Sequence, residues 1–427
     1  MSGFAETFWL SLSATLQAAS LASTGIYFHR AGFVETPQVL ARYFQQIGLP
    51  CLFFAKIVFS RIKTNQEDDF GDDNFIRSAL LFVWPIYVVM CGLFIGHILA
   101  FCAGLPAEQR KVLLVATSIG NSTSLPLILL TAMAASNEKM GAAADRVLSS
   151  FFVLYPLLQW GMGGTLLGLG ELSPQKSNKR HKRNFTLTRS SSSSTISSSS
   201  RNDEVVLDER IQMDIERPDC IVATVIDAEE ASTNSKRRLK TGIDNQLNCF
   251  RASVQRAVRQ PPVVGAFLAS FVTLVPFLQA SLVEGSLKWL GQAIITIGNA
   301  AVPVSMAVLG VNLSIAFSSN CKIEEYINHD LVIAGATGKL LFMPLIGLST
   351  IRVLHFYLDL DPGTAMAMSL LFCTPTASAV MVMTDLSPVL DKKTQMGMAR
   401  MLALQYLVAP VFLPLWVMRT IRIAHGG

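Results

Sequence analysis

Short polar side chains interrupt two long apolar stretches of this 427-residue chain, roughly 250 residues apart. The first interruption reads Gly-Asn-Ser-Thr-Ser-Leu-Pro and begins at Gly120, and the second reads Thr-Pro-Thr-Ala-Ser and begins at Thr374. Because proline and glycine break helices, each interruption would free backbone N–H and C=O groups inside an apolar layer. The amino terminus of a half-helix carries partial positive charge, so these residues favour the binding of an anion.

The residues of both interruptions are the predicted ligands of that anion, because their amides and hydroxyls supply donors and acceptors at one depth. The alternative for each serine or threonine is helix packing or a hydrogen bond to a carbonyl of its own helix. Asn121 differs from them, since an amide beside a glycine turn has no simple packing role. The predicted set is Gly120, Asn121, Ser122, Thr123, Ser124, Pro126, Thr374, Pro375, Thr376 and Ser378.

Two lysines, Lys56 and Lys339, add candidate positive charges inside apolar stretches. An ionisable residue at membrane depth is costly and usually functional. Either lysine would pair with a substrate carboxylate or stabilise the interrupted segments when no substrate is bound. The alternative for Lys56 is that its ammonium extends to the membrane surface, since this lysine lies near the end of its stretch.

The composition is that of a polytopic membrane protein, because 51% of the residues are hydrophobic and only 15% are charged. Stretches of about 20 apolar residues predict ten transmembrane helices and an all-α fold. These stretches lie near residues 6–27, 37–60, 77–101, 111–133, 147–169, 262–283, 289–314, 330–353, 364–386 and 397–421.

The ten stretches fall into two halves of five, residues 1–170 and 260–427, separated by a polar segment, residues 171–259. That segment contains a serine run between Ser190 and Ser200 and is basic at both ends, so we expect a disordered linker on the cytosolic side. Serines beside basic residues suggest a kinase as a partner, and a solvated spacer is the alternative.

Prolines recur in the same order in the two halves, which indicates an internal duplication. Because each half holds an odd number of helices, the second copy would be inverted relative to the first. Inverted repeats with one interrupted helix in each copy are typical of secondary transporters that work by alternating access. The matched pairs are Pro50 with Pro303, Pro85 with Pro344, Pro126 with Pro375, and Pro156 with Pro410.

Other classes of function lack their motifs. The net charge of +5 is explained by membrane topology, so we expect no nucleic acid partner. The seven cysteines form no Cys-x-x-Cys pair, which argues against a metal site or a disulfide framework, and no cofactor is expected. Neither Gly-x-Ser-x-Gly nor His-Glu-x-x-His occurs, so we expect no enzyme.

These residues resemble the auxin efflux carrier family, and within it the PIN-like branch. The similarity includes Gly120 to Leu127 (GNSTSLPL), Gly291 to Leu313, Lys339 to Gly347 and the pair Gln405-Tyr406, in both halves but not in the linker. The chain departs from the family pattern in having Thr123-Ser124 in place of a second Gly-Asn pair. The resemblance implies a ten-helix fold in which the broken fourth and ninth helices cross near the bilayer centre. It also implies transport of a small organic anion such as indole-3-acetate.

Two further functions compete with such a carrier. One is a receptor or sensor that binds its ligand without transport, and the other is an organic acid symporter coupled to protons or sodium. Few acidic residues lie deep in the apolar stretches, which favours a carrier that binds no coupling ion. The lipid bilayer of the endoplasmic reticulum or of the plasma membrane is the expected location, and a homodimer is a candidate assembly.

Overall fold

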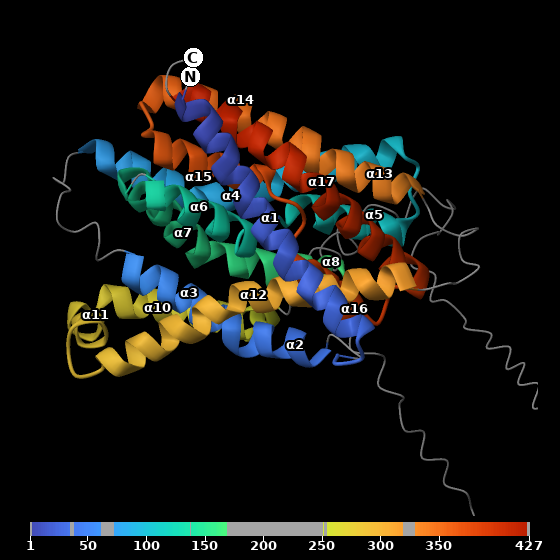
Figure 1. The fold of residues 1–427 in the computed structure, drawn as a ribbon, viewed down its shortest axis with the longest axis horizontal. Helices are drawn as coiled ribbons and strands as arrows, with labels where there is room; N and C mark the ends of the chain where they lie inside the picture. The colour runs from blue at the N-terminus through green and yellow to red at the C-terminus, as the bar shows by residue number, and fades with distance from the viewer. Residues whose placement is uncertain are drawn as a thin grey trace, which may run out of the picture. The chain divides into compact units, whose positions relative to one another are not determined.

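A computed structural model describes residues 2–34, 38–60, 72–136, 138–168, 251, 254–318 and 329–424. In these ranges the chain is helical apart from turns and short connections, and its β structure is one isolated bridge, between Gly120 and Thr376. Met1–Leu172 and Cys249–Gly427 together form one compact unit (Figure 1). The predicted linker, with its serine run, lies outside the described residues except near its carboxyl end, where residues 254–258 are helical.

Helices cover most of each of the ten predicted stretches, and the fourth and the ninth are interrupted. The first half contains α1 (Ser2–Arg30), α2 (Gln38–Tyr43), α3 (Leu49–Ser60), α4 (Asp72–Cys102), α5 (Ala107–Ser118), α6 (Ser124–Ser136), α7 (Glu138–Leu158) and α8 (Gly164–Leu166). The second half contains α10 (Pro261–Leu274), α11 (Pro276–Val283), α12 (Lys288–Ser318), α13 (His329–Thr337), α14 (Met343–Leu358), α15 (Pro362–Cys373), α16 (Ser378–Leu386) and α17 (Lys392–Ala424). Three π-helical turns join neighbouring helices, at Phe44–Gly48, Gln159–Gly163 and Gly338–Phe342.

Among the residues that the structure describes, five continuous helical segments are long and apolar enough to cross a membrane, and a sixth is the pair α10 and α11, which bends by 104°. The bend follows from Pro276, which cannot continue the hydrogen bonding of α10. The five segments are Arg77–Cys102, Glu138–Leu166, Lys288–Ile315, His329–Leu358 and Lys392–Ala424. The chain is therefore a multi-pass helical membrane protein.

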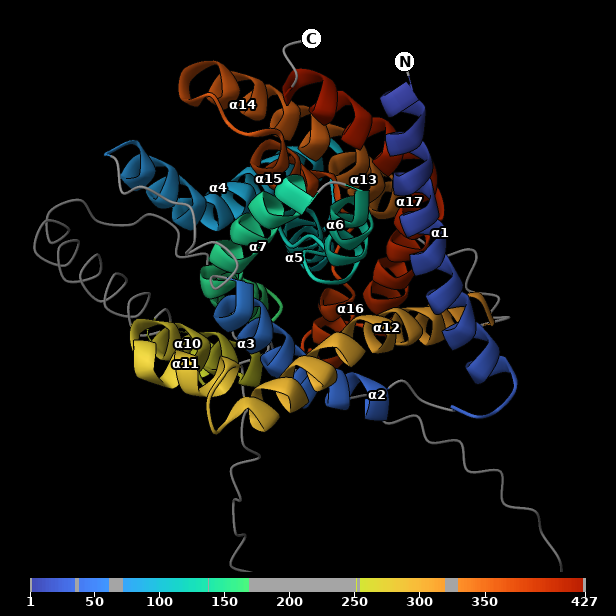
Figure 2. The same ribbon diagram turned by 60° about the vertical axis from the view of Figure 1, so that its left-hand side comes forward.

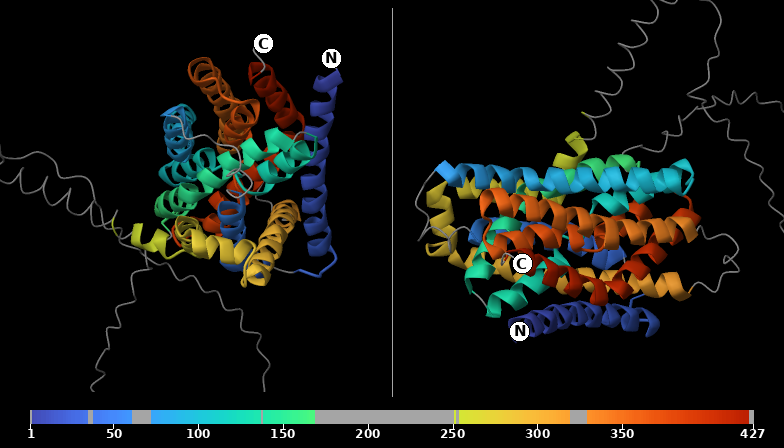
Figure 3. Two further views of the ribbon diagram at one scale, coloured as in Figure 1. Left: turned by 90° about the vertical axis from the view of Figure 1, so that its left-hand side faces the viewer. Right: turned by 90° about the horizontal axis from the view of Figure 1, so that it is seen from above.

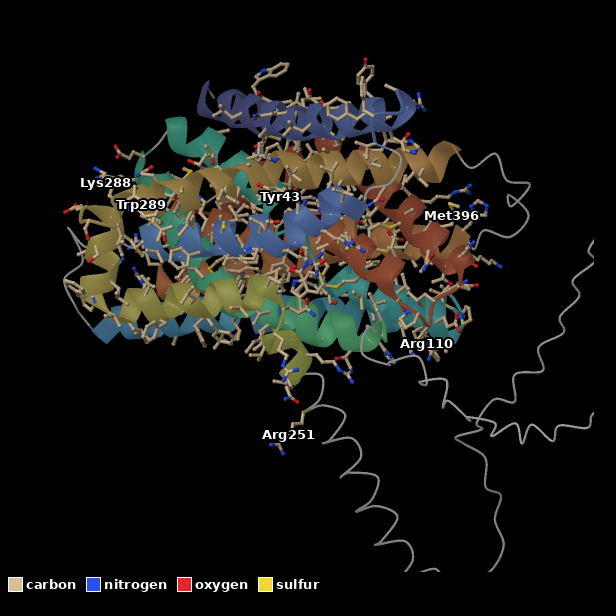
Figure 4. All side chains as sticks on the ribbon, turned by 90° about the horizontal axis from the view of Figure 1, so that it is seen from below. Tyr43, Arg110, Arg251, Lys288, Trp289 and Met396 are labelled. Carbon is tan, nitrogen blue, oxygen red and sulfur yellow. The ribbon has the colours of Figure 1, made fainter. Side chains whose placement is uncertain are left out.

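For description we divide the helices into two groups, each with helices from both halves of the sequence (Figure 2). The groups are in contact, because α1 packs on α6 and α17 and α3 packs on α7. We call α1, α2, α3, α10, α11 and α12 the scaffold group and the remaining helices, α4 to α8 and α13 to α17, the crossing group. The axes of the long helices are roughly aligned when the bundle is seen from above (Figure 3). Lys288 and Trp289 lie at one end of the bundle, and Arg110 and Met396 lie at the other (Figure 4).

Glycines allow α1 and α12 to approach closely inside the scaffold group. A Cβ atom built on Gly310 would lie 1.8 Å from the carbonyl oxygen of Ala22, and one on Gly25 would lie 2.1 Å from that of Ala307. Small residues at such contacts let backbones meet where no hydrophobic effect drives helices together. The contact between α1 and α12 thus depends on the absence of a side chain at both positions.

We expect Gly310→Ala to lower the thermal unfolding temperature of the purified protein. The added methyl group must move α1 away from α12, and overpacking of this kind costs about 1–3 kcal/mol. Gly161→Ala is the matched control, because the nearest atom to a Cβ there, that of Ala257, is 3.3 Å away. Equal unfolding temperatures for the two variants would contradict the close packing of α1 on α12.

Candidate functional site

Both predicted interruptions are breaks between helices in the structure. The first break separates the end of α5 at Ser118 from the start of α6 at Ser124, and the second separates Cys373 from Ser378. Thr374 is extended, with φ −74° and ψ 144°, since the following proline disfavours the helical conformation of the residue before it. Each break leaves backbone N–H and C=O groups without a partner in their own helix.

The two breaks contact each other through their backbones, as the resemblance implied. The Asn121 N–H donates to the carbonyl of Pro375 at 2.6 Å, and the Ala377 N–H donates to the carbonyl of Ile119 at 3.1 Å. These N–H and C=O groups have no partner within a helix, and they pair with each other across the crossing. Leaving one such group unpaired in an apolar environment would cost several kcal/mol.

Asn121 joins the first break to two other elements. Its side-chain oxygen accepts from the Ser124 N–H at 3.0 Å, so it caps α6, and its side-chain amide donates to the Tyr406 hydroxyl at 2.7 Å. The side chain is buried at 1% exposure. Asn121 therefore holds the start of α6, the second break and α17 in one arrangement.

Two tyrosines that we did not predict as site residues hold one break each. Tyr155 of α7 donates to the Gly120 carbonyl at 2.6 Å, and Tyr406 of α17 donates to the Thr376 carbonyl at 3.1 Å. Gln405 also contacts the second break, because its side-chain oxygen accepts from the Thr376 N–H at 2.8 Å. The resemblance marked the pair Gln405-Tyr406, but no sequence pattern identified Tyr155.

We expect Tyr406→Phe to destabilise the protein more than Tyr155→Phe. Loss of the Tyr406 hydroxyl leaves both the Asn121 amide and the Thr376 carbonyl without that partner, which costs about 1–3 kcal/mol per buried group. The Gly120 carbonyl keeps a second donor, the Ser122 N–H, when Tyr155 is changed. Thermal unfolding in detergent measures the difference, and a larger loss for Tyr155→Phe would contradict the network.

Two buried hydroxyls in the breaks have no hydrogen-bond partner. They belong to Thr374, at 0% exposure, and to Ser122, at 3% exposure. By contrast, Thr376 donates to the Ala116 carbonyl at 2.7 Å, and Ser124 pairs with Ser305 of α12. Since buried polar groups are normally paired, the Thr374 hydroxyl is an exception among the side chains of the breaks.

The amino termini of α6 and α16 differ. Asn121 caps α6, whereas Ala377, which precedes α16, has no side chain that could cap that helix. Ser378 begins α16 and is buried at 6% exposure. The first turn of α16 therefore keeps N–H groups that could donate hydrogen bonds to an anion.

Of the two predicted lysines, Lys339 contacts the end of α5 at the first break, whereas Lys56 forms an ion pair with a residue of α7. The Lys339 ammonium is fully buried and donates to the Thr117 carbonyl at 3.1 Å. A Cβ atom on Gly120 would lie 3.0 Å from this nitrogen and 2.9 Å from the Thr374 hydroxyl. Gly120 thus allows the lysine and the second break to approach the first break together.

Lys56 of α3 forms an ion pair with Asp145 of α7 at 3.3 Å, between the scaffold group and the crossing group. We did not predict Asp145 as a membrane residue, because the apolar stretch begins at residue 147. The structure starts α7 at Glu138 instead, so Asp145 lies two turns inside the helix. With side-chain exposures of 25% and 34%, the pair contributes about 1 kcal/mol or less to stability.

Thr123, Pro126 and Pro375, the remaining predicted residues, lie at different positions relative to the breaks. Thr123 is half-buried in the first break, and Pro126 is buried in the first turn of α6, where a proline is tolerated. Pro375 instead lies inside the second break. The predicted match of Pro126 with Pro375 is therefore wrong in detail, because one proline belongs to a helix and the other precedes one.

Comparisons with known proteins agree with this architecture. A family described as membrane transport proteins matches residues 33–417, a range that contains both breaks. A protein of Schizosaccharomyces pombe named as an uncharacterized transporter is 22% identical over 425 residues, covering 90% of this chain and 89% of the relative. Since the family match extends over most of the sequence, the chain belongs to the auxin efflux carrier family of membrane transport proteins.

Proposed function

We propose that the protein is a secondary transporter that moves a small organic anion, such as indole-3-acetate or another carboxylate, by alternating access. The observation that carries this proposal is the contact between two helix breaks from opposite halves of the chain. Paired broken helices are where carriers bind their substrates, because half-helix ends supply charge without exposing backbone to lipid. The function of a carrier, rather than of an enzyme, also agrees with the family.

An inverted repeat with ten spans is part of the proposal. α5 and α15 begin at residues 107 and 362, α6 and α16 at 124 and 378, and α7 and α17 at 138 and 392, so matched elements are about 255 residues apart. Four segments would join the six apolar ones as spans: α1, α2 with α3, α5 with α6, and α15 with α16. α5 and α12 begin at opposite ends of the bundle, as this topology requires (Figure 4).

The substrate carboxylate would bind at the second break. The uncapped first turn of α16 supplies N–H groups from Ser378 onward, and the Thr374 hydroxyl supplies a further donor. The buried charge of Lys339 would compensate the carboxylate, since an uncompensated ion in hydrocarbon costs on the order of 20 kcal/mol. The first break, Gly120 to Ser124, would form the opposite wall.

Flux measurements in proteoliposomes test the proposal. We expect saturable uptake of at least one labelled indole carboxylate or small metabolic acid, absent from liposomes without protein. Saturable binding without uptake would favour a receptor or sensor instead, and neither binding nor uptake of any carboxylate would contradict an organic anion as the substrate. The endoplasmic reticulum or plasma membrane location, a homodimer and a kinase that acts on the linker stay predictions.

We expect Thr374→Val and Thr376→Val to separate substrate binding from stability. The Thr374 hydroxyl has no partner in the protein, so its loss should raise the KM for the anion about tenfold with little change in unfolding temperature. The Thr376 hydroxyl donates to the Ala116 carbonyl, so its loss should lower the unfolding temperature. An unchanged KM for Thr374→Val would remove this hydroxyl from the proposed site.

A further inference from the structure

The break at the end of α5 leaves a carbonyl without its helical partner. The Thr117 carbonyl would accept from the Asn121 N–H in a continuous helix, but that N–H donates to Pro375 across the crossing. Carbonyls at the carboxyl end of a helix carry partial negative charge. In coupled carriers, half-helix carboxyl ends and unwound carbonyls of this kind coordinate the driving cation.

Lys339 places its ammonium at this carbonyl, 3.1 Å from the oxygen. The lysine belongs to the π-helical turn Gly338–Phe342, a distortion that often marks a functional position within a helix. Gly338 permits the approach, since a Cβ atom there would lie 3.0 Å from a side-chain carbon of Thr117. The contact between this turn and α5 is therefore built into the backbone of both elements.

The lysine has no acidic partner at the crossing. The ion pair between Lys56 and Asp145 lies elsewhere, and in the described part of the chain no carboxylate forms an ion pair with the Lys339 nitrogen. A buried ammonium is costly unless another group compensates it. Without substrate, the carboxyl end of α5 compensates the charge of Lys339. With substrate bound, the anion would add to that compensation.

We propose that the Lys339 ammonium is a tethered substitute for the coupling cation that a sodium-driven carrier would bind at the carboxyl end of α5. This inference rests on the proposed function and extends it. The substrate and the positive charge would cross the membrane together as a neutral pair, and no ion from solution is needed. Uptake by the wild-type protein should therefore be the same, within twofold, in sodium and in N-methylglucamine media.

The decisive variant is Lys339→Ala, because the removed atoms correspond to propylammonium. We expect uptake by this variant to fall at least tenfold and to recover in part when propylammonium or sodium is added, whereas bulky tetramethylammonium should have no effect. Lys111→Ala is the control, since Lys111 is an exposed lysine of α5, and its uptake should be unchanged. A merely structural lysine would not make uptake depend on a small cation.

Three results would overturn the inference: sodium-dependent uptake by the wild-type protein, unchanged uptake by Lys339→Ala, or a folded variant that no small cation restores. If Lys339→Ala does not fold, Lys339→Gln keeps a donor for Thr117 and removes the charge. Uptake by Lys339→Gln near the wild-type level would show that the hydrogen bond alone matters, and a tenfold loss would support the charge.

A second readout needs no substrate and separates this inference from the proposed function. Propylammonium should raise the thermal unfolding temperature of purified Lys339→Ala, or of Lys339→Gln to a smaller extent, and leave that of the wild-type protein unchanged. If the wild-type protein takes up no anion, the proposed function is contradicted. The thermal shift would still test whether Lys339 occupies a site for a small cation. No shift in the alanine variant would count against the tethered cation.

Discussion

Replacing Asn121 by alanine should reduce anion uptake by about 100-fold while the protein still inserts and folds. The change removes the cap of α6, worth about 0.5–2 kcal/mol, and the donor to Tyr406, worth about 1 kcal/mol. The two losses together are about 1.5–3 kcal/mol, and the upper end of that range corresponds to about a 100-fold change in rate. Initial uptake rates in proteoliposomes, normalised to the inserted protein, measure the effect.

Two companion variants show whether position or charge is responsible. Asn121→Asp keeps an oxygen that can cap α6 but places negative charge beside the proposed anion site, so we expect it to remain folded and to lose uptake. Gln279→Ala is the control, because it removes an amide of the scaffold group that donates to the Val58 carbonyl at 3.0 Å. Wild-type uptake by Asn121→Ala would place the substrate path elsewhere.

Gly120→Val should abolish uptake, and Gly120→Ala should reduce it to an intermediate level. The first added carbon would lie 2.9 Å from the Thr374 hydroxyl and 3.0 Å from the Lys339 nitrogen, and valine adds two further methyl groups. The lysine nitrogen ends a flexible chain and can move, whereas the Thr374 oxygen is attached to a β-branched Cβ with few rotamers, so relief there requires the second break to shift. The breaks must therefore separate, at a cost of about 1–3 kcal/mol or more.

The graded series distinguishes this steric effect from general instability. Gly161→Ala adds a carbon whose one neighbour within 4 Å is the Cβ of Ala257 at 3.3 Å, a contact that a shift of a few tenths of an ångström relieves, so this variant should keep both its uptake and its unfolding temperature. If Gly120→Val transports as well as the wild-type protein, the two breaks do not need to remain in contact during transport. Equal losses for the alanine and valine variants would also contradict the steric argument, since the clash grows with side-chain size.

Helix positions and helix breaks were predictable because both depend on short-range chemistry. Apolar runs of about 20 residues located ten helical stretches, and glycine and proline beside short polar residues located the two breaks near Gly120 and Thr374. The same reasoning missed the first turns of α7, where a run of small and charged residues hides the helix start at Glu138. For that reason Asp145, the partner of Lys56, was not counted among the membrane residues.

The sequence by itself determined that this is a helical membrane protein with two interrupted helices, because composition and local breaking residues set both properties. Only the tertiary structure decided which side chains meet at the breaks. Tyr155 and Gln405 reach them from α7 and α17, Lys339 reaches the end of α5, and Lys56 pairs elsewhere. Such contacts join residues far apart in the chain, and helix packing, which no local pattern encodes, determines the distances between them.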